Sequence, residues 1–205
     1  MNTWTDFNDA EQQQGFDLIP KGTTVKVRMT IKPGGHDDPA QGWTGGYATE
    51  SFDTGSVYFA CEFVVLEGAY ARRKMWSNIG LHSSKGPTWG QMGRSMIRGI
   101  LNSARNVHPQ DNTTYATSRR RIEGFHELDG IEFLARVDVE KDAKGENRNV
   151  VKLAVEPDHK DYASLMGVAS KAPAAGGSTG APAPTAPQQA ATQRPAVPGK
   201  PAWAQ

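Results

Sequence analysis

The 205-residue chain contains a single cysteine, Cys61, so an internal disulfide and a CxxC-type zinc site are both excluded. A lone cysteine within an apolar run is most often a small core residue, and the lack of disulfides fits a reducing cytoplasm. Long hydrophobic runs are also missing, whereas a membrane-spanning helix needs about 20 consecutive apolar residues. The N-terminus shows no basic segment followed by an apolar stretch, so no secretory signal is expected. We therefore expect a cytoplasmic protein with no membrane-embedded part.

Sequence motifs for catalysis are scarce as well. The histidines show no HxxxH-like ligand spacing, and the HDD run at residues 36–38 is only superficially similar to a metal cluster. The chain has no GxxxxGK[ST] phosphate loop and no GxSxG nucleophile elbow. Cys61 lies in the middle of a strand-like run and is a poor nucleophile candidate. We predict no catalytic residue, no metal and no cofactor, and hence a protein that is not an enzyme.

Acidic residues are absent after residue 166, where the chain carries Lys171, Arg194 and Lys200 together with seven of its 13 prolines. Such a segment buries too little apolar area to offset the entropy lost on ordering. We predict a folded domain over residues 1–166 and a disordered Pro/Ala/Gly-rich tail over residues 167–205. The domain then holds 20 of the 23 cations and all 22 acids, so it lacks a globally basic surface for nucleic acid. Any electrostatic site must come from local segregation of charge.

Alternation of apolar and polar residues is the clearest structural signal. In "TTVKVRMTIK" the apolar side chains occupy every second position from Val25 to Ile31, which is typical of a half-buried strand. The same period of two recurs from Val57 to Val65. Five segments are therefore predicted to form strands: 23–32, 56–67, 70–81, 131–140 and 147–155.

A helix is predicted between the third and fourth strands. Residues 88–105 place apolar side chains three and four positions apart, from Trp89 to Leu101, on one helical face. Three strands, a helix and two strands is the layout of the OB-fold, a partly open five-stranded barrel that binds oligonucleotides on its strand 2–3 face. We predict a mainly β fold: a five-stranded OB-fold-like barrel with one helix between strands 3 and 4, followed by the disordered tail. An SH3-like barrel and a plain α+β sheet are the alternatives.

The third predicted strand carries three cations between two aromatic residues, which a strand that only built a core would not need. If its odd positions face inward, the outward strip interleaves two aromatics with two cations: Tyr70, Arg72, Lys74 and Trp76. Aromatic faces stack bases at about 1–3 kcal/mol each, and cations follow the phosphates, so this strip predicts a single-strand-binding face. The alternative is an edge strand protected by charge, with the opposite parity and Trp76 in the core.

Two further regions each allow a functional and a structural interpretation. The connection at residues 33–54 is long for a loop without secondary structure and holds Trp43, Tyr47 and Phe52. Its aromatics either close over a bound strand or pack locally within a mobile insertion. The arginines of the predicted helix and of the "SRRR" run at residues 118–121 form either a second phosphate-contacting patch or a solvated basic surface.

Together these segments resemble a known family. "CEFVVLEGAYARRKMW", the "GRSMIRGILNSAR" helix, "LDGIEFLARVDVEKD" and "NRNVVKLAVEPDHKDY" are similar to phage- and prophage-type single-stranded DNA-binding proteins over about residues 14–162. The resemblance implies an OB-type barrel that coats single strands during replication or recombination in a bacterial or phage-infected cell. It places the hairpin from Tyr70 to Trp76 at the nucleic-acid face. The "PGKPAWAQ" terminus departs from the acidic tip of familiar relatives, which leaves Trp203 as a candidate partner-docking residue.

The predicted function is sequence-independent binding of single-stranded DNA, with RNA and homo-oligomerisation left open. The tail is the predicted contact for replication or recombination proteins. The alternatives are a non-catalytic interaction module and an undetected metal-dependent nuclease. The candidate nucleic-acid-binding residues are Lys26, Arg28, Trp43, Tyr47, Tyr58, Tyr70, Arg72, Arg73, Lys74 and Trp76.

Overall fold

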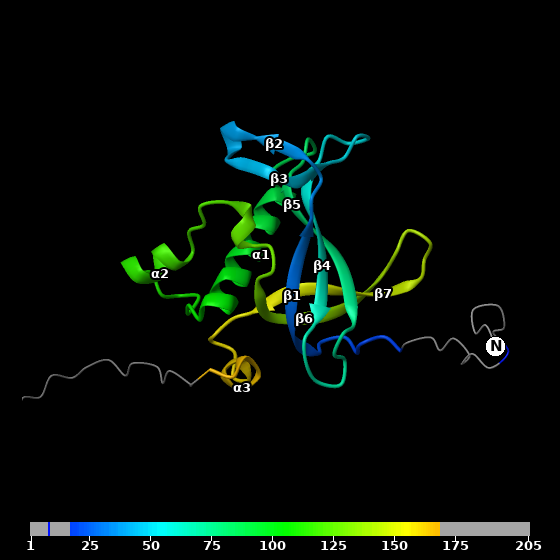
Figure 1. The fold of residues 1–205 in the computed structure, drawn as a ribbon, viewed down its shortest axis with the longest axis vertical. Helices are drawn as coiled ribbons and strands as arrows, with labels where there is room; N and C mark the ends of the chain where they lie inside the picture. Colours follow the sequence, from blue (N-terminus) through cyan, green and yellow to red (C-terminus); the bar gives the residue numbers. More distant parts are fainter. Residues whose placement is uncertain (1–7, 9–16, 169–205) are drawn as a thin grey trace, which may run out of the picture. The chain divides into compact units, whose positions relative to one another are not determined.

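A curled antiparallel sheet forms the centre of the computed structural model, which describes residue 8 and residues 17–168 (Figure 1). The prediction of a mainly β fold is confirmed, and the helix appears at its predicted bounds as α1 (Thr88–Arg105). The short helical elements are α2 (Thr114–Arg119), α3 (Tyr162–Met166) and the 3-10 turns η1 (Pro39–Gln41) and η2 (Phe125–Glu127). The strands are β1 (Thr24–Lys32), β2 (His36–Asp38), β3 (Trp43–Glu50), β4 (Val57–Val65), β5 (Lys74–His82), β6 (Glu132–Lys141) and β7 (Asn147–Val155).

The pairing of the strands makes the sheet curl. β1 pairs with β4 on one side and with β6 on the other, β4 pairs with β5, and β6 pairs with β7, all antiparallel. The two outermost of these strands, β5 and β7, then approach each other, and the Val151 backbone N–H donates to Ser77 Oγ at 3.2 Å. We call this junction the β5–β7 seam. It is held by a side chain rather than by a ladder of backbone bonds, so the curled sheet is open there.

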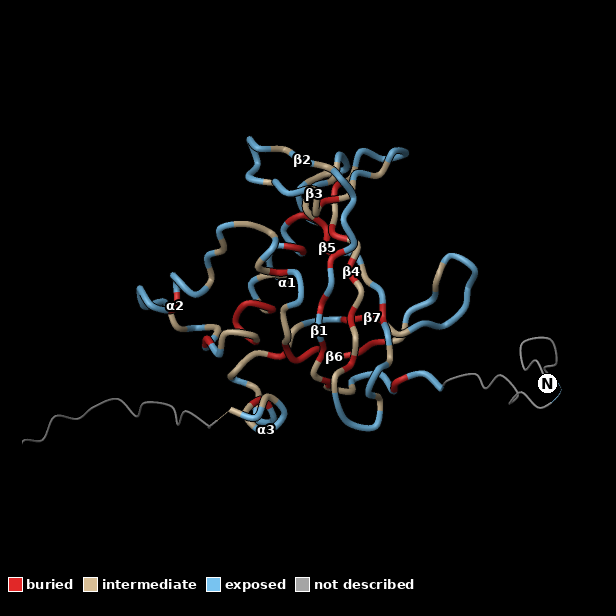
Figure 2. Tube along the Cα trace, viewed as in Figure 1, coloured by how far each residue is buried: buried red, intermediate tan, exposed pale blue. Residues whose placement is uncertain are grey.

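The predicted inward residues of the first two strands are confirmed. Every second side chain of β1 and β4 is buried, with Val27, Met29, Phe59 and Phe63 at 0% exposure. Phe63 meets Phe133 of β6 edge to face, with ring centroids 6.1 Å apart. Figure 2 shows buried stretches along β1, β4 and β6, whereas the β6–β7 turn and most of α2 are exposed. The core therefore lies inside the curl of the sheet.

Helix α1 touches the end of β5 backbone to backbone. A Cβ added at Gly93 would lie 1.7 Å from the carbonyl oxygen of Gly80, and one at Gly90 would lie 2.6 Å from that of Leu81. Glycine is required at such positions because any side chain would push the helix off the strand. This contact fixes the first turns of α1, and hence Trp89, against β5.

The connection at residues 33–54, expected to lack regular structure, forms the β2–β3 hairpin, so the sheet has two strands more than predicted. Alternating periodicity is weak in this glycine-rich segment, which explains the miss. Asp38 caps the intervening 3-10 turn by accepting from the Ala40 N–H at 3.0 Å. β3 pairs with the start of β4 through Thr49 and Tyr58.

The third strand starts at Lys74, not at Tyr70 as predicted. The preceding residues form the turn after β4, in which Arg72 adopts the left-handed conformation with φ 69°. At the C-terminal side the folded part extends slightly beyond the predicted boundary, because Gly167 ends α3 and Val168 packs near Leu134. The remainder of the predicted tail, with Trp203, lies outside the described residues.

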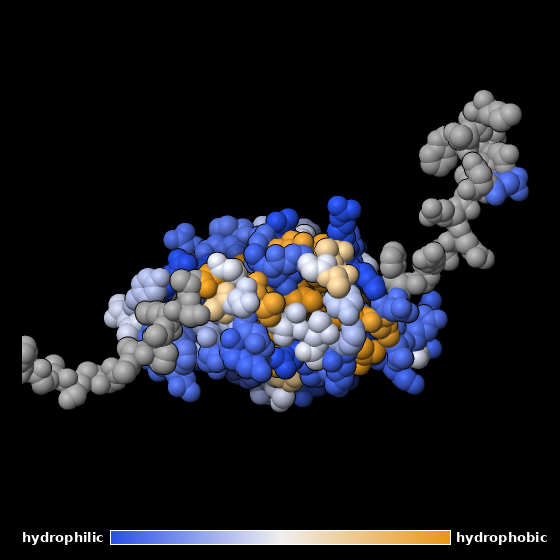
Figure 3. Space-filling view, turned by 90° about the horizontal axis from the view of Figure 1, so that it is seen from below, coloured by the Kyte–Doolittle hydropathy of each residue, from blue (hydrophilic) through white to orange (hydrophobic). Residues whose placement is uncertain are grey.

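The surface mixes polar side chains with small apolar patches, as the view from below in Figure 3 shows. The large apolar side chains that are exposed among the described residues are Leu18, Phe52, Trp76, Met92, Tyr115, Leu153 and Leu165. Within the described part of the chain, no helix is both long and apolar enough to cross a membrane.

Candidate nucleic-acid interface

The side of β4 and β5 that faces away from the core, here called the outer face, carries the residues of interest. Met75 and Ile79 are buried at 1% and 3% exposure, whereas Trp76 between them is 55% exposed. Lys74 and Asn78 are exposed as well. Of the two parities that the sequence leaves open for this strand, the one with even positions outward is observed from Lys74 to Asn78.

Trp89 joins the outer face from helix α1. A Cβ at Gly80 would lie 2.4 Å from the Trp89 indole, so the ring covers the backbone of β5. Its centroid is 6.1 Å from that of Tyr58 on β4, with the planes tilted by 52°. Sequence reasoning assigned Trp89 to the core face of the helix. The signal that could have corrected this is Gly80, because an isolated glycine within a strand often marks close approach of another group.

Tyr58, Trp76 and Trp89 thus line one face, and we call them the aromatic strip. Trp76 and Gly80 are four residues apart on β5, which is about 13 Å at about 3.3 Å per residue. Between them lies Asn78, whose register partner on β4 is Ala60. Only short side chains therefore lie between the Trp76 and Trp89 rings, so a planar group can reach the face of either ring.

The cations beside the aromatic strip are paired with carboxylates. Lys74 Nζ lies 3.0 Å from Glu62 Oε1, and both side chains are largely solvated. On β1, Arg28 Nη2 lies 2.6 Å from Glu132 Oε1, while Lys26 Nζ lies 3.8 Å from the other oxygen of Glu132. Exposed pairs of this kind are worth about 0–1 kcal/mol, so a phosphate can displace the carboxylate.

Lys32 lies on the same side of the sheet as these cations, and its register partner is Ala60. Lys32 is not among the candidate site residues chosen from the sequence. Within residues 17–168 it has no carboxylate partner. Lys32 is therefore the cation near the aromatic strip that is most available to a phosphate.

The turn at residues 66–73 separates the other hairpin candidates from the aromatic strip. Tyr70 is partly buried and packs against the core cluster. Arg72 is exposed, and the Arg73 guanidinium donates to the backbone carbonyl of Asp17. The strip from Tyr70 to Trp76 expected from the sequence is thus interrupted at Lys74.

The aromatics of the β2–β3 hairpin pack locally. Trp43 and Tyr47 are half-buried against the core cluster, and the Trp43 ring lies 6.3 Å from that of His36. Phe52 is different: it is fully exposed in the turn between β3 and β4. Of the aromatics in this connection, only Phe52 offers an uncovered ring.

Three of the six arginines of α1 and the SRRR run are bound to backbone carbonyls, whereas the side chains of Arg94, Arg119 and Arg121 are exposed and form no hydrogen bond or ion pair within the described residues. Arg98 donates to Pro109 O at 3.0 Å. Arg105 donates to the carbonyls of Arg119 and Arg121 and pairs with Glu127. Arg120 makes four hydrogen bonds, to the side chain of Asn102 and to the carbonyls of His108, Pro109 and Asp111. We call Arg98, Arg105 and Arg120 the arginine cluster.

The groups that could support metal or thiol chemistry have structural roles. Asp37 accepts from the Gly46 N–H at 2.7 Å, and His36 lies 3.1 Å from Glu50. No group of three or more potential ligands gathers within the described part of the chain. Burial raises the pKa of the Cys61 thiol to about 12, and nearby Asp129 adds to this, so the thiolate nucleophile does not form near neutral pH.

No family model matches the chain, and no curated protein shows significant similarity to it.

Proposed function

We propose that the protein binds single-stranded DNA without sequence selectivity, by stacking bases on the aromatic strip and contacting phosphates with the neighbouring cations. The observation that supports this most strongly is Trp76, a large ring 55% exposed on a strand, on the same face as Tyr58 and Trp89. Burying an aromatic ring against a base is favourable, whereas leaving it in water is not. Every base offers a π-face, so such a strip accepts any sequence.

The order of elements supports an OB-type barrel as the framework for this function. β1, β4 and β5 correspond to its first three strands, α1 follows the third, and β6 and β7 complete the five. In that fold the oligonucleotide lies across the second and third strands, which here are β4 and β5. The β2–β3 hairpin is then an elaboration of the first connection. This arrangement agrees with the resemblance to phage-type proteins of replication and recombination.

The ion pairs predict how affinity depends on salt. When DNA binds, a phosphate replaces Glu62 as the partner of Lys74, and the counterions of that phosphate are released. A phosphate contact from Lys32 releases counterions in the same way. Each neutralised phosphate adds about −0.7 to the slope of log K against log salt for a single strand. Two or three contacts therefore give a moderate slope, and stacking supplies the remaining affinity.

A protein-interaction module is the second candidate, and Phe52 favours it. The turn that presents this ring is well fixed, because the Ser51 carbonyl accepts from the Gly55 N–H at 2.8 Å and the Ser51 N–H donates to Ser56 at 2.8 Å. Large aromatics presented on rigid turns are typical anchors in protein interfaces. If the protein is an interaction module, Phe52→Ala abolishes partner capture. If it binds DNA through the aromatic strip, Phe52→Ala leaves DNA affinity unchanged.

The test is fluorescence anisotropy with labelled oligo-dT of about 20 nucleotides and with a duplex of equal length. The wild type should prefer the single strand, and Trp76→Ala should weaken binding by about 1–3 kcal/mol. Tyr115→Ala is the matched control, because Tyr115 is an even more exposed aromatic (67%) on α2, and it should leave affinity unchanged. Equal loss in both variants, or no binding by the wild type, contradicts the proposal.

A further inference from the structure

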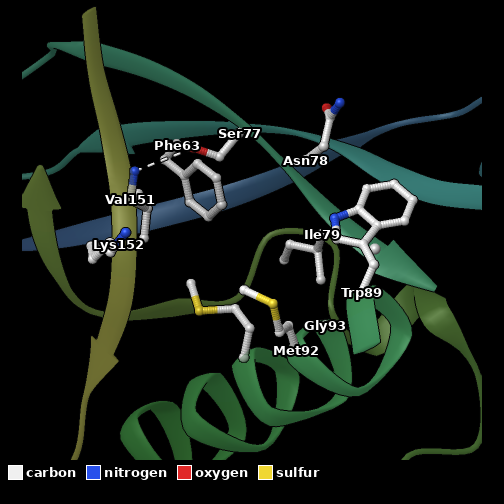
Figure 4. Close-up of a pocket in the computed structure, with 11 residues that line it drawn as sticks. Phe63, Ser77, Asn78, Ile79, Trp89, Met92, Gly93, Val151 and Lys152 are labelled. Atoms are coloured by element: carbon white, nitrogen blue, oxygen red, sulfur yellow. Dashed lines mark hydrogen bonds between the residues drawn. The ribbon is translucent and has the colours of Figure 1, made fainter. Parts of the chain in front are cut away.

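A cavity of about 150 Å³ opens where α1 crosses the β5–β7 seam (Figure 4). Its apolar walls come from the sheet interior and the helix (Phe63, Ile79, Met92, Met96 and Val151), and Lys152 of β7 also lines it. A cavity of about this volume in a protein core accommodates benzene, so the space corresponds to one six-membered ring. Met92 is 65% exposed, which places the opening at the surface beside α1.

Polar groups that could address such a ring lie on the β5 side of the cavity. The Ser77 hydroxyl oxygen accepts from the Val151 N–H, and its own proton remains available for donation. The Trp89 indole N–H has no hydrogen-bond partner among the described residues, whereas the Asn78 amide points away from the cavity (Figure 4). In Figure 4 the indole nitrogen points toward the cavity side of the ring. These donors match the carbonyl groups that pyrimidine bases carry.

The cavity is continuous with the aromatic strip. Trp89 and Asn78 line the cavity and also belong to the outer face. A strand stacked along the strip therefore passes the mouth of the cavity, and one base can turn into it while its neighbours stay on the rings. An apolar protein side chain would fill the volume as well, but it would leave the unpartnered donors unsatisfied.

We infer that the β5–β7 seam cavity receives one base of the bound strand and, being the size of a single ring, selects a pyrimidine over a purine. This inference rests on the proposed function. It predicts that a protein with little sequence selectivity still has a base-class preference at one position per bound molecule.

The ratio of affinities for oligo-dT and oligo-dA tests this inference. The wild type should bind oligo-dT more tightly, and Val151→Phe, which fills the cavity, should reduce the ratio by about fivefold or more, the value of one stacked base. Because self-stacking of oligo-dA is the same for both proteins, the change in the ratio reports the cavity. Leu153→Phe on the same strand is the control, since Leu153 is 44% exposed and does not line the cavity.

Met92→Ala provides a second route if Val151→Phe does not fold, because Met92 lines the cavity and is 65% exposed at its mouth. Shortening this side chain should widen the opening, admit a purine and lower the ratio. A wild-type ratio near one, or a ratio unchanged by these substitutions while binding persists, overturns the cavity as a base site and assigns it to an apolar side chain. That result leaves the proposed function standing. Absence of binding to either strand overturns both.

Discussion

Trp76 on the outer face and Arg120 after α2 belong to two regions whose sequences both suggest nucleic-acid binding. In the structure the two side chains have different surroundings. The Trp76 ring has more than half of its surface in water. The Arg120 guanidinium donates four hydrogen bonds, one to the Asn102 side chain of α1 and three to backbone carbonyls within residues 108–111. Trp76 presents uncovered surface to a ligand, whereas Arg98, Arg105 and Arg120 use their donors within the fold.

This difference shows that a count of cations does not locate a binding site. A guanidinium that satisfies carbonyl groups cannot leave them without an energetic penalty, because those carbonyls would lose their donors. A lysine in an exposed ion pair loses little when a phosphate replaces the carboxylate. Affinity should therefore depend on the aromatic strip and its lysines, and stability on the arginine cluster.

The largest effect is expected from a substitution that breaks the contact holding Trp89 on the outer face. Gly93→Ala puts a methyl group 1.7 Å from the Gly80 carbonyl oxygen and should cost at least about 3 kcal/mol of folding stability. Gly99→Ala is the control in the same helix, since its Cβ would meet Ala154 Cβ at 3.3 Å and Glu156 Oε1 at 4.0 Å and no backbone atom. Urea denaturation measures both. Similar stabilities for the two variants would contradict the backbone contact between α1 and β5.

Arg120→Ala tests the structural role of the arginine cluster. It removes four hydrogen bonds and leaves the side-chain amide oxygen of Asn102, a residue of 0% exposure, without its donor. A loss of about 2–4 kcal/mol in the free energy of unfolding is therefore expected. Arg120→Lys should recover only part of this, because an ammonium group lacks the planar fork. Thermal denaturation gives the stability, and anisotropy below the melting temperature should give wild-type affinity. Normal stability with weakened DNA binding would reverse the assignment of the two regions.

Glu62→Gln tests the other region of the comparison, the outer face. Freeing Lys74 and removing a carboxylate beside the register partner Trp76 should raise oligo-dT affinity several-fold at about 50 mM salt, and less at about 200 mM. Stability should change by less than about 0.5 kcal/mol. Glu146→Gln is the control, since it removes one exposed carboxylate from the β6–β7 turn, away from the outer face. An unchanged affinity in Glu62→Gln would place the phosphates elsewhere.

The smallest effect concerns acid stability. The backbone N–H of Glu123, and then Arg105, hold the pKa of the Glu127 carboxyl below its ordinary value of 4.5. A depressed pKa contributes stability that is present above the ordinary value and is lost as the pH falls through the lowered one. The wild type should therefore lose more stability than Glu127→Gln as the pH falls below about 4.5, as urea midpoints would show. Parallel pH profiles would refute this contribution.

The elements with strong periodicity could be predicted from the sequence. The alternation from Val25 to Ile31 and from Val57 to Val65 gave the correct inward sets, and the spacing in residues 88–105 gave α1 at its observed bounds. The β2–β3 hairpin could not be found in this way, because its glycines and short strands carry no clear alternation.

The site was harder to predict than the fold because it depends on contacts between distant residues. The sequence leaves both parities open for Trp76, and Trp89 reaches the outer face only through the close contact of Gly80 with Gly93. Arg120 has the same residue type as a phosphate ligand, and only its partners in space show a structural role. Periodicity identifies which face a side chain occupies, not what it touches.

Photo-crosslinking with an oligo-dT strand in which 5-iodouracil replaces thymine tests the central claim most directly. Irradiation joins the base to a ring in contact with it, and mass spectrometry of the digested complex identifies the peptide. The account predicts adducts on the peptides that contain Trp76 and Trp89. Adducts confined to residues 98–121 or to the β2–β3 hairpin would contradict it.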